Sequence, residues 1–347
     1  MPKALSVVVC SIMSLLASAG VARAQQAASP AHYFAGKSIK LVIPTGPGGA
    51  YGLYGLLFAQ HYGRHVPGNP SVTPEYRSGA GGIVASNYIY TVAPKDGTVI
   101  GIPLAPFVLA QFTGGPNVQY DVAKFNWIGQ ISDITRLMVV WSGPKIRTFE
   151  DFISQEVVVG STGRGSETFM NPAIINAVFG AKLKIVDGYK GSGDLMIALE
   201  RGEIGAVSGT WGNFAGNHAD WLRDKKITLI TQIGVKKVAA YPEVPLLQDL
   251  AKNPEDRKLI EFMSLMTTSV GYSVLAPPGV PENVLAILRK AFDATMADPA
   301  FLSDAKKRNA DIAPEKHTEI ARAVAEAVRS PKLLFERFTS IVGTGKK

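Results

Sequence analysis

The stretch LVIPTGPGGAYGLYGLLFAQHYG, Leu41 to Gly63, decides the fold of this chain. A short apolar run at 39–43 ends at Pro44 and passes into a loop with four glycines among residues 46–52, after which an apolar, helix-like stretch begins. This order predicts a strand, a tight loop and a helix. Because glycine lets backbone N–H groups approach a ligand and a helix start attracts anions, the loop is a candidate anion site.

A second glycine-rich loop repeats this pattern. In VVVGSTGRGSETF, a predicted strand at 157–159 leads into the loop Ser161–Ser166, and a helix is predicted from about Glu167. For either loop alone, a tight strand-to-helix turn without a ligand is the simpler interpretation. Two such loops at equivalent places favour a shared anion site, because ligands bind beyond the carboxyl ends of parallel strands.

Strands and helices alternate along most of the chain. A strand is predicted at 72–76, the segment RSGAGG follows at 77–82, a helix is predicted over about 83–92, and the final third is helical. This alternation predicts an α/β fold class in which each sheet is mainly parallel and flanked by helices. Roughly 320 residues beyond a leader are enough for two domains.

The first 24 residues have the pattern of a secretory signal peptide. Lys3 gives a weakly basic start, residues 5–16 are apolar, and Ala22-Arg23-Ala24 is an A-x-A cleavage pattern. We therefore expect segment 1–24 to be removed by cleavage after Ala24 and the protein to work in the periplasm. The single cysteine, Cys10, lies in this segment, so the mature chain is expected to contain no disulfide.

The composition and charge of the chain argue against nucleic-acid binding. The chain has 46% hydrophobic and 18% charged residues and a formal net charge of +8. Its basic residues are dispersed and never form a polybasic run, which argues against nucleic-acid binding. A mild positive field favours small anions as ligands.

Known catalytic and cofactor motifs are incomplete. The dinucleotide fingerprint G-x-G-x-x-G begins at Gly46 but has Tyr51 at its last glycine position. His61 and His65 have a spacing that can bind zinc, yet Tyr62 stands where a metalloprotease has glutamate, so we interpret both as surface histidines. A G-x-S-x-G nucleophile elbow is absent. We expect no metal, no cofactor and no catalytic residue.

The ordered motifs resemble a known family over residues 34 to about 328: the substrate-binding proteins of tripartite tricarboxylate transporters, or Bug/TctC-type receptors. Relatives carry similar segments in the same order. In this chain they read KSIKLVIPTGPGG, RSGAGG, VAPKDG, VGSTGRGS, GYKGSG, ALERGEI, YPEVPLLQDL and VLAPPGVPENVLAILRKAFDATMADPAF. Single motifs of this kind are weak, whereas eight in order are specific.

The resemblance implies a two-domain periplasmic-binding-protein fold that closes on its ligand. Domain 1 would comprise 36–136 and 262–347, and domain 2 would comprise 137–261. A small carboxylate would bind between them, and the receptor, a monomer, would deliver it to a large and a small membrane subunit. The alternative is an orphan receptor that serves a signalling partner.

The expected ligand contacts come from three loops and one aromatic residue. They are Thr45, Gly46, Pro47, Gly48, Gly49, Ala50 and Tyr51 in the first loop, Ala80 and Gly81 in the RSGAGG segment, Ser161, Thr162, Gly163, Arg164 and Ser166 in the second loop, and Trp211. Arg164 has two alternatives, contact with the carboxylate or exposure to solvent.

Departures from the family pattern suggest the kind of carboxylate. Relatives commonly offer aspartate where this chain has Gly52 and an acid where it has Gly209. We expect space at these positions, with Tyr51 and Trp211 covering an apolar ligand body, and Glu167 facing its own helix dipole. Because an unpaired buried ammonium is very costly, the ligand is expected to lack an amine.

Overall fold

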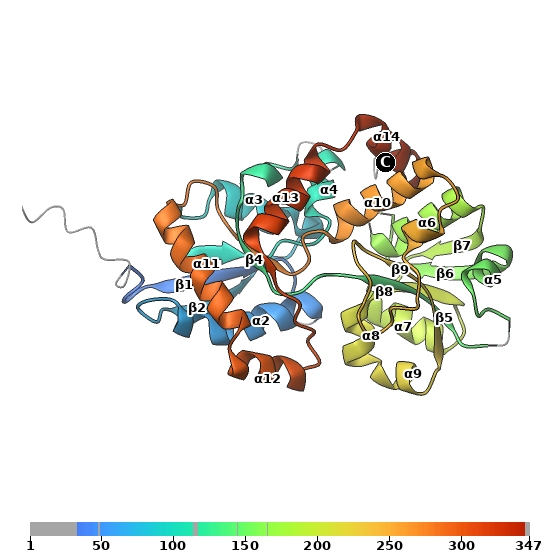
Figure 1. Cartoon of the computed structure of the whole chain (residues 1–347), viewed down its shortest axis with the longest axis horizontal. Coiled ribbons are helices and arrows are strands. Elements are labelled where there is room, and N and C mark those ends of the chain that lie inside the picture. Colours follow the sequence, from blue (N-terminus) through green and yellow to red (C-terminus); the bar gives the residue numbers. More distant parts are fainter. Residues whose placement is uncertain (1–32, 48, 114–116, 144, 165, 344–347) are drawn as a thin grey trace, which may run out of the picture.

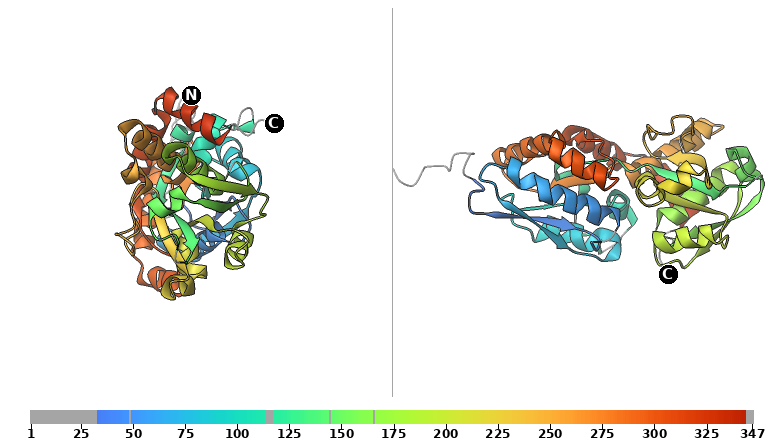
Figure 2. Two further views of the ribbon diagram at one scale, coloured as in Figure 1. Left: turned by 90° about the vertical axis from the view of Figure 1, so that its right-hand side faces the viewer. Right: turned by 90° about the horizontal axis from the view of Figure 1, so that it is seen from below.

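The computed structural model describes residues 33–343 except 48, 114–116, 144 and 165. Within them the chain builds two sheets, each flanked by helices, in two halves that lie end to end (Figure 1; Figure 2, right). The predicted signal peptide and its cleavage site lie outside the described residues. None of the described helices is long and apolar enough to cross a membrane.

The first sheet has six strands in the order β11-β4-β10-β3-β1-β2. Its strands are β1 (Ser38–Ile43), β2 (Ser71–Tyr76), β3 (Val99–Gly101), β4 (Asn126–Gln130), β10 (Ser273–Ala276) and β11 (Glu315–Lys316). Strand β1 pairs in parallel with β2 and β3, whereas β10 is antiparallel to β3 and β4, and β11 is antiparallel to β4. We call this part of the molecule the six-stranded half.

The second sheet has five strands in the order β7-β6-β8-β5-β9. Its strands are β5 (Arg136–Trp141), β6 (Glu156–Ser161), β7 (Lys182–Asp187), β8 (Ala206–Thr210) and β9 (Ile227–Ile233). Strand β6 is parallel to β7 and β8, and β5 is antiparallel to β8 and β9. We call this part the five-stranded half.

Both sheets are mixed but mainly parallel, as expected. Most strands run in one direction, β1 to β4 in the first sheet and β6 to β9 in the second, whereas β10, β11 and β5 run against them. Strands β3 and β4 of the first sheet and β8 of the second end where the chain passes between the halves, and β10 and β5 begin there. Ser273 of β10 is paired with Gln130 at the end of β4, and Arg136 of β5 is paired with Thr210 at the end of β8. A strand that starts at the edge where its neighbours end must run antiparallel to them.

Helices cover both sheets and begin close to the predicted positions. The helices of eight or more residues are α2 (Ala50–Tyr62), α3 (Ile83–Thr91), α6 (Glu167–Phe179), α7 (Ser192–Glu200), α10 (Pro254–Thr268), α11 (Glu282–Met296), α12 (Pro299–Lys307), α13 (His317–Val328) and α14 (Lys332–Val342). The shorter ones are α4 (Phe107–Thr113), α5 (Phe149–Ser154), α8 (Trp211–Asn217) and α9 (Ala219–Arg223). Helix α14 packs on α6 and α10 (Figure 1). The domain boundaries inferred from the sequence stay a prediction.

Five residues, 131–135, form the passage between β4 and β5, and we call them the junction segment. On one side, Ile131 N donates to Tyr272 O (3.0 Å) and Tyr272 N donates to Ser132 O (2.8 Å). On the other side, Trp211 N donates to Thr135 O (2.9 Å). Because unpaired backbone groups are costly when buried, these bonds tie elements of both halves to one short segment.

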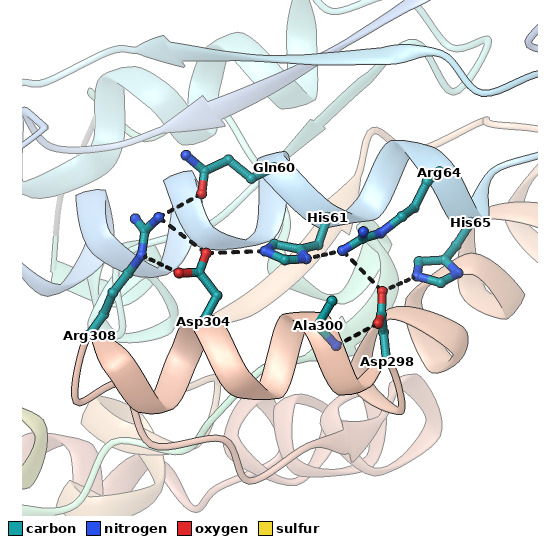
Figure 3. Close-up of polar contacts among 8 residues, drawn as sticks. All are labelled: Gln60, His61, Arg64, His65, Asp298, Ala300, Asp304 and Arg308. Atoms are coloured by element: carbon teal, nitrogen blue, oxygen red, sulfur yellow. Dashed lines mark hydrogen bonds and ion pairs between the residues drawn. The ribbon is translucent and has the colours of Figure 1, made fainter.

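A ladder of charged side chains fastens α12 to α2 (Figure 3). His61 Nε2 lies 3.2 Å from Asp304 Oδ2, and His65 Nε2 lies 2.9 Å from Asp298 Oδ2. Arg64 also pairs with Asp298, at 3.0 Å. The side chain of His61 is only 11% exposed, so this histidine is a packing and pairing residue rather than a surface one. In the described part of the chain, no group of three or more histidine, cysteine, aspartate and glutamate residues could hold a metal ion.

This ladder predicts a pH dependence of stability. Hydrogen bonds from His65 and His61 hold the carboxyl pKa values of Asp298 and Asp304 below their ordinary value of 3.8. A carboxyl whose pKa is lowered by folding stabilises the fold above that ordinary value, and the contribution is lost as the pH falls through the lowered pKa. We expect Asp298→Asn with Asp304→Asn to lower the free energy of unfolding at neutral pH and to differ less from the wild type at about pH 3.

Urea unfolding of both proteins across that pH range measures the effect. Asp187→Asn is the control, because Asp187 is exposed and makes no ion pair with a described residue. A difference between wild type and double variant that stays constant over the whole range would contradict this account of the ladder.

Candidate ligand-binding site

The first loop brings the end of β1 to the start of α2. Thr45 Oγ1 donates to Gly46 O (3.2 Å), and Gly49 precedes the helix with φ 82°, a conformation that suits glycine. No side chain caps the N-terminus of α2. Gly48 lies outside the described residues.

Tyr51, in the first turn of α2, points toward the interior. Its hydroxyl accepts a hydrogen bond from Ala105 N (2.7 Å), and its ring meets Tyr272 edge-on at 5.0 Å between centroids. Tyr54 stacks on Tyr272 at 4.0 Å. Although Tyr272 is only 3% exposed, its hydroxyl makes no hydrogen bond to any residue the structure describes. The hydroxyl hydrogens of Tyr51 and Tyr272 are therefore not donated to any described residue.

The RSGAGG segment gives a strained turn at the end of β2. Ala80 has φ 45°, and Gly79, Gly81 and Gly82 also have positive φ values. A left-handed alanine is uncommon and indicates local strain. Ala80 and Gly81 are exposed, and contact between either of them and a ligand stays a prediction.

The second loop is held by its own hydroxyl groups. Ser161 Oγ, fully buried, accepts from Gly163 N (3.0 Å), and Ser166 Oγ donates to Gly163 O (2.7 Å). Thr162 N donates to Thr168 Oγ1 (2.9 Å). These bonds fix the loop backbone at the start of α6, which has no side-chain cap. Direct contact between these hydroxyls and a ligand stays a prediction.

Of the two alternatives for Arg164, exposure to solvent fits the structure, in which this residue is exposed. Its guanidinium lies over the ring of Phe169, 5.0 Å from the centroid. A Cβ atom at Gly343, which follows α14, would lie 3.6 Å from Arg164 Nη1. The side chain therefore reaches along the surface toward the end of the C-terminal helix.

An ion pair that the sequence did not suggest lies next to this loop. Arg136 opens β5 and Glu167 opens α6, and Arg136 Nη2 lies 2.5 Å from Glu167 Oε1. Their side chains are 12% and 15% exposed. The expectation that Glu167 interacts with its own helix dipole thus missed its main partner, because its carboxylate is paired with the Arg136 guanidinium. A charged residue at the start of the apolar strand RLMVVW was the available signal.

The electrostatics connect this pair to the two tyrosines. Burial raises the pKa of the Tyr51 hydroxyl well above its ordinary value, Tyr272 and Glu167 raise it further, and Arg136 opposes the shift. Burial also raises the pKa of Tyr272, with Arg136 lowering it and Glu167 raising it. Both hydroxyls consequently stay protonated at neutral pH and can donate a hydrogen bond. Arg136 and Glu167 are close enough to Tyr51 and Tyr272 to influence both.

Trp211 opens α8 on the other side of the junction segment. It borders a crevice of about 10 Å³ that Tyr54, Ser132 and Tyr272 also line, which has room for one water molecule. Its ring meets Tyr241 edge-on at 5.6 Å. Contact between Trp211 and a ligand stays a prediction.

The expected space at two glycines is absent. A Cβ atom at Gly52 would lie 2.1 Å from the backbone oxygen of Pro47, and one at Gly209 would lie 2.8 Å from the ring of Phe214. Gly209 faces a buried apolar cluster that includes Leu195. An acid at either position would therefore displace the first loop or the core, so the missing acids say nothing about room for a ligand body.

The close approach at Gly52 predicts the outcome of a substitution. A backbone carbonyl cannot turn aside as a flexible side chain does, so Gly52→Ala is expected to displace the first loop and lower the free energy of unfolding by about 1–3 kcal/mol. Gly46→Ala is the matched control, because a Cβ atom there meets nothing within 4 Å. Denaturant unfolding measures both, and a Gly52→Ala protein as stable as the control would refute the packing argument.

Comparison with known proteins places these features in a family. The family model described as "Tripartite tricarboxylate transporter family receptor", TctC, matches residues 68–339. The "UPF0065 protein in gbd 5'region" of Cupriavidus necator is 23% identical over 335 residues, which cover 94% of each chain.

Three solved structures have the same fold. A TctC solute binding protein from Polaromonas without ligand has a TM-score of 0.67 at 16% identity, over 86% of this chain and 98% of that one. Rpa4515 of R. palustris with adipate has a TM-score of 0.64 at 20% identity, over 88% and 97%. MatC from Rhodopseudomonas palustris with bound malate has a TM-score of 0.59 at 18% identity, over 88% and 98%.

The matched family and these neighbours are solute-binding receptors, not enzymes. Since the family match covers most of its length, this chain belongs to the TctC family of tripartite tricarboxylate transporter receptors.

Proposed function

We propose that this protein captures a small carboxylate between its two halves in the periplasm and delivers it to the large and small membrane subunits of a tripartite transporter. The observation that carries this proposal is the pair of uncapped helix starts at the junction. Helices α2 and α6 each begin after a glycine-containing loop, and neither N-terminus is capped by a side chain. Free N–H groups and the helix dipole favour an anion at both positions.

The surrounding groups suit a carboxylate better than a cation. The hydroxyls of Tyr51 and Tyr272 stay protonated and can each donate a hydrogen bond to an oxygen. An ionised carboxylate accepts hydrogen bonds and donates none, so it matches a set of donors. The adipate and malate named for the two structural neighbours are dicarboxylates, which supports the same class of ligand here.

Capture would proceed by closure of the two halves. The junction segment joins them through main-chain hydrogen bonds, so a rotation about this region moves the two helix starts toward or away from each other. Ligand contacts made only in the closed state would shift the protein toward that state. Secretion, with cleavage after Ala24, would bring the receptor to the compartment that the transporter faces.

A thermal-shift panel tests the carboxylate class. Ligands that bind only the folded state raise the melting temperature, by an amount that corresponds to about 2.7 kcal/mol of stabilisation at a concentration 100 times the Kd. We expect stabilisation by at least one of malate, adipate and benzoate, and none by aspartate or glutamate. Stabilisation by an amino acid alone would contradict the proposed ligand class.

Delivery is tested separately by uptake of the stabilising carboxylate. We expect deletion of the receptor gene to abolish uptake of this carboxylate by the cell. Reintroducing the intact gene should restore the uptake. Normal uptake without the receptor would instead favour a sensor that serves a signalling partner.

A further inference from the structure

The ion pair between Arg136 and Glu167 stands apart from the other ion pairs of the described residues. Arg136 lies directly after the junction segment, and Glu167 lies directly after the second loop. Their 2.5 Å contact is largely covered, with side chains 12% and 15% exposed. Pairs such as Lys184 with Glu156 are, by contrast, about 60% exposed on both sides.

Glu167 uses only part of the hydrogen-bonding capacity of Arg136. The guanidinium has five N–H donors, and the described contact with Glu167 involves Nη2 alone. Its Nε is buried without a hydrogen-bond partner, and Nη1 makes no hydrogen bond to a described residue. A buried donor without a partner costs about 1–3 kcal/mol, so it calls for an explanation beyond stability.

Stability alone does not explain the pair. Replacing a buried ion pair by apolar residues of similar volume is often neutral or stabilising, because removing two charges from water offsets their attraction. The pair also lies where the halves meet, because Arg136 directly follows the junction segment, to which Tyr272 is joined by main-chain hydrogen bonds. A charge-balanced pair keeps a cation at the boundary between the halves at a lower cost than an isolated arginine would.

The acidic groups near Tyr272 other than Glu167 do not compete for this role. Asp133, in the junction segment, acts on Tyr272 but is bound to Lys236 at 3.3 Å. Asp311 borders the same crevice as Tyr272 but is exposed to solvent. The unused donors of Arg136 and the hydroxyls of Tyr51 and Tyr272 thus form a set of hydrogen-bond donors in which Glu167 is the paired acid. A planar guanidinium matches a carboxylate in a two-point hydrogen-bonded geometry.

We propose that Arg136 is the charged anchor for the ligand carboxylate and that Glu167 positions the guanidinium and limits how tightly it binds. This inference rests on the proposed function and names the side chain that selects the ligand charge. An ammonium near the same guanidinium would be repelled, and Glu167, already neutralised by Arg136, could not fully offset the repulsion. The pair therefore selects carboxylates without an amine.

Substitutions that remove the positive charge of Arg136 or the negative charge of Glu167 distinguish a ligand-binding pair from a purely structural one. Arg136→Gln removes the anchor and leaves a carboxylate to repel the ligand, whereas Glu167→Gln frees the whole guanidinium. With malate and adipate as probes in titration calorimetry, we expect Arg136→Gln to weaken binding at least tenfold and Glu167→Gln to tighten it severalfold. The double variant should bind more weakly than the wild type and more tightly than Arg136→Gln.

Matched controls come from the exposed pair in the same half. Glu156→Gln and Lys184→Gln change the net charge by the same amounts, at the far end of β6, roughly 16 Å along the strand from the second loop. We expect both to keep the Kd within twofold. Arg136→Lys retains the positive charge but lacks the planar set of guanidinium donors, so its affinity for the carboxylate should lie between those of the wild type and Arg136→Gln.

Each outcome bears on a different statement. Circular dichroism and thermal melting of each variant without ligand show whether it folds. If Arg136→Gln does not fold, Glu167→Gln and the double variant still show whether removing each charge strengthens or weakens carboxylate binding. Weaker binding by Glu167→Gln, or no loss in Arg136→Gln, would overturn the inference while leaving a carboxylate receptor intact. If no carboxylate in the thermal-shift panel binds the wild type, the proposed function fails and this inference fails with it.

Discussion

The hydrogen bonds along the junction segment are the constraint on which the rest of the structure depends. Tyr272 exchanges two main-chain bonds with Ile131 and Ser132, and Trp211 donates to Thr135. Strand β5 begins at the next residue, so Arg136 is placed by main-chain geometry before its side chain makes any contact. The positions of Tyr272, Arg136 and the start of α8 are therefore all fixed by main-chain bonds to the junction segment or by direct continuation from it. Substituting a side chain at these positions alters the chemistry and leaves the main-chain bonds in place.

The second loop is held in one conformation by its own hydroxyl groups. The hydroxyl groups of Ser161, Ser166 and Thr168 form hydrogen bonds with the backbone of the loop itself. These bonds hold the N-terminus of α6 in one conformation. Rigid loops lose less entropy when a ligand binds, so this arrangement favours affinity even where the hydroxyls do not touch the ligand. In the proposed site the loop would act through its backbone N–H groups, whereas selection by charge would depend on side chains outside it.

Local patterns in the sequence were sufficient for the strand-loop-helix units but not for what brings them together. The glycine loops, the helix starts at Ile83 and Glu167 and the two-sheet α/β class could all be predicted, because propensity and glycine spacing act over a few residues. The antiparallel strands could not, because their direction depends on where the chain passes between the sheets. The partner of Glu167 lies 31 residues away, and Gly52 and Gly209 were misinterpreted because their neighbours, Pro47 and Phe214, fill the space only after folding.

The route of the chain also limits how the two halves can move. It passes between them at the junction segment, again between β9 and β10, and a third time between α13 and α14, where α14 leaves the six-stranded half to pack on α6. Three connections in one region permit rotation about a line through them but resist sliding. Helix α14 contacts both halves, because its end lies beside Arg164 of the second loop and its Phe335 meets Phe112 of α4 at 5.4 Å between ring centroids. The C-terminal helix thus supports the second loop on one side and packs on the six-stranded half on the other, so any rotation of the halves must alter at least one of these two contacts.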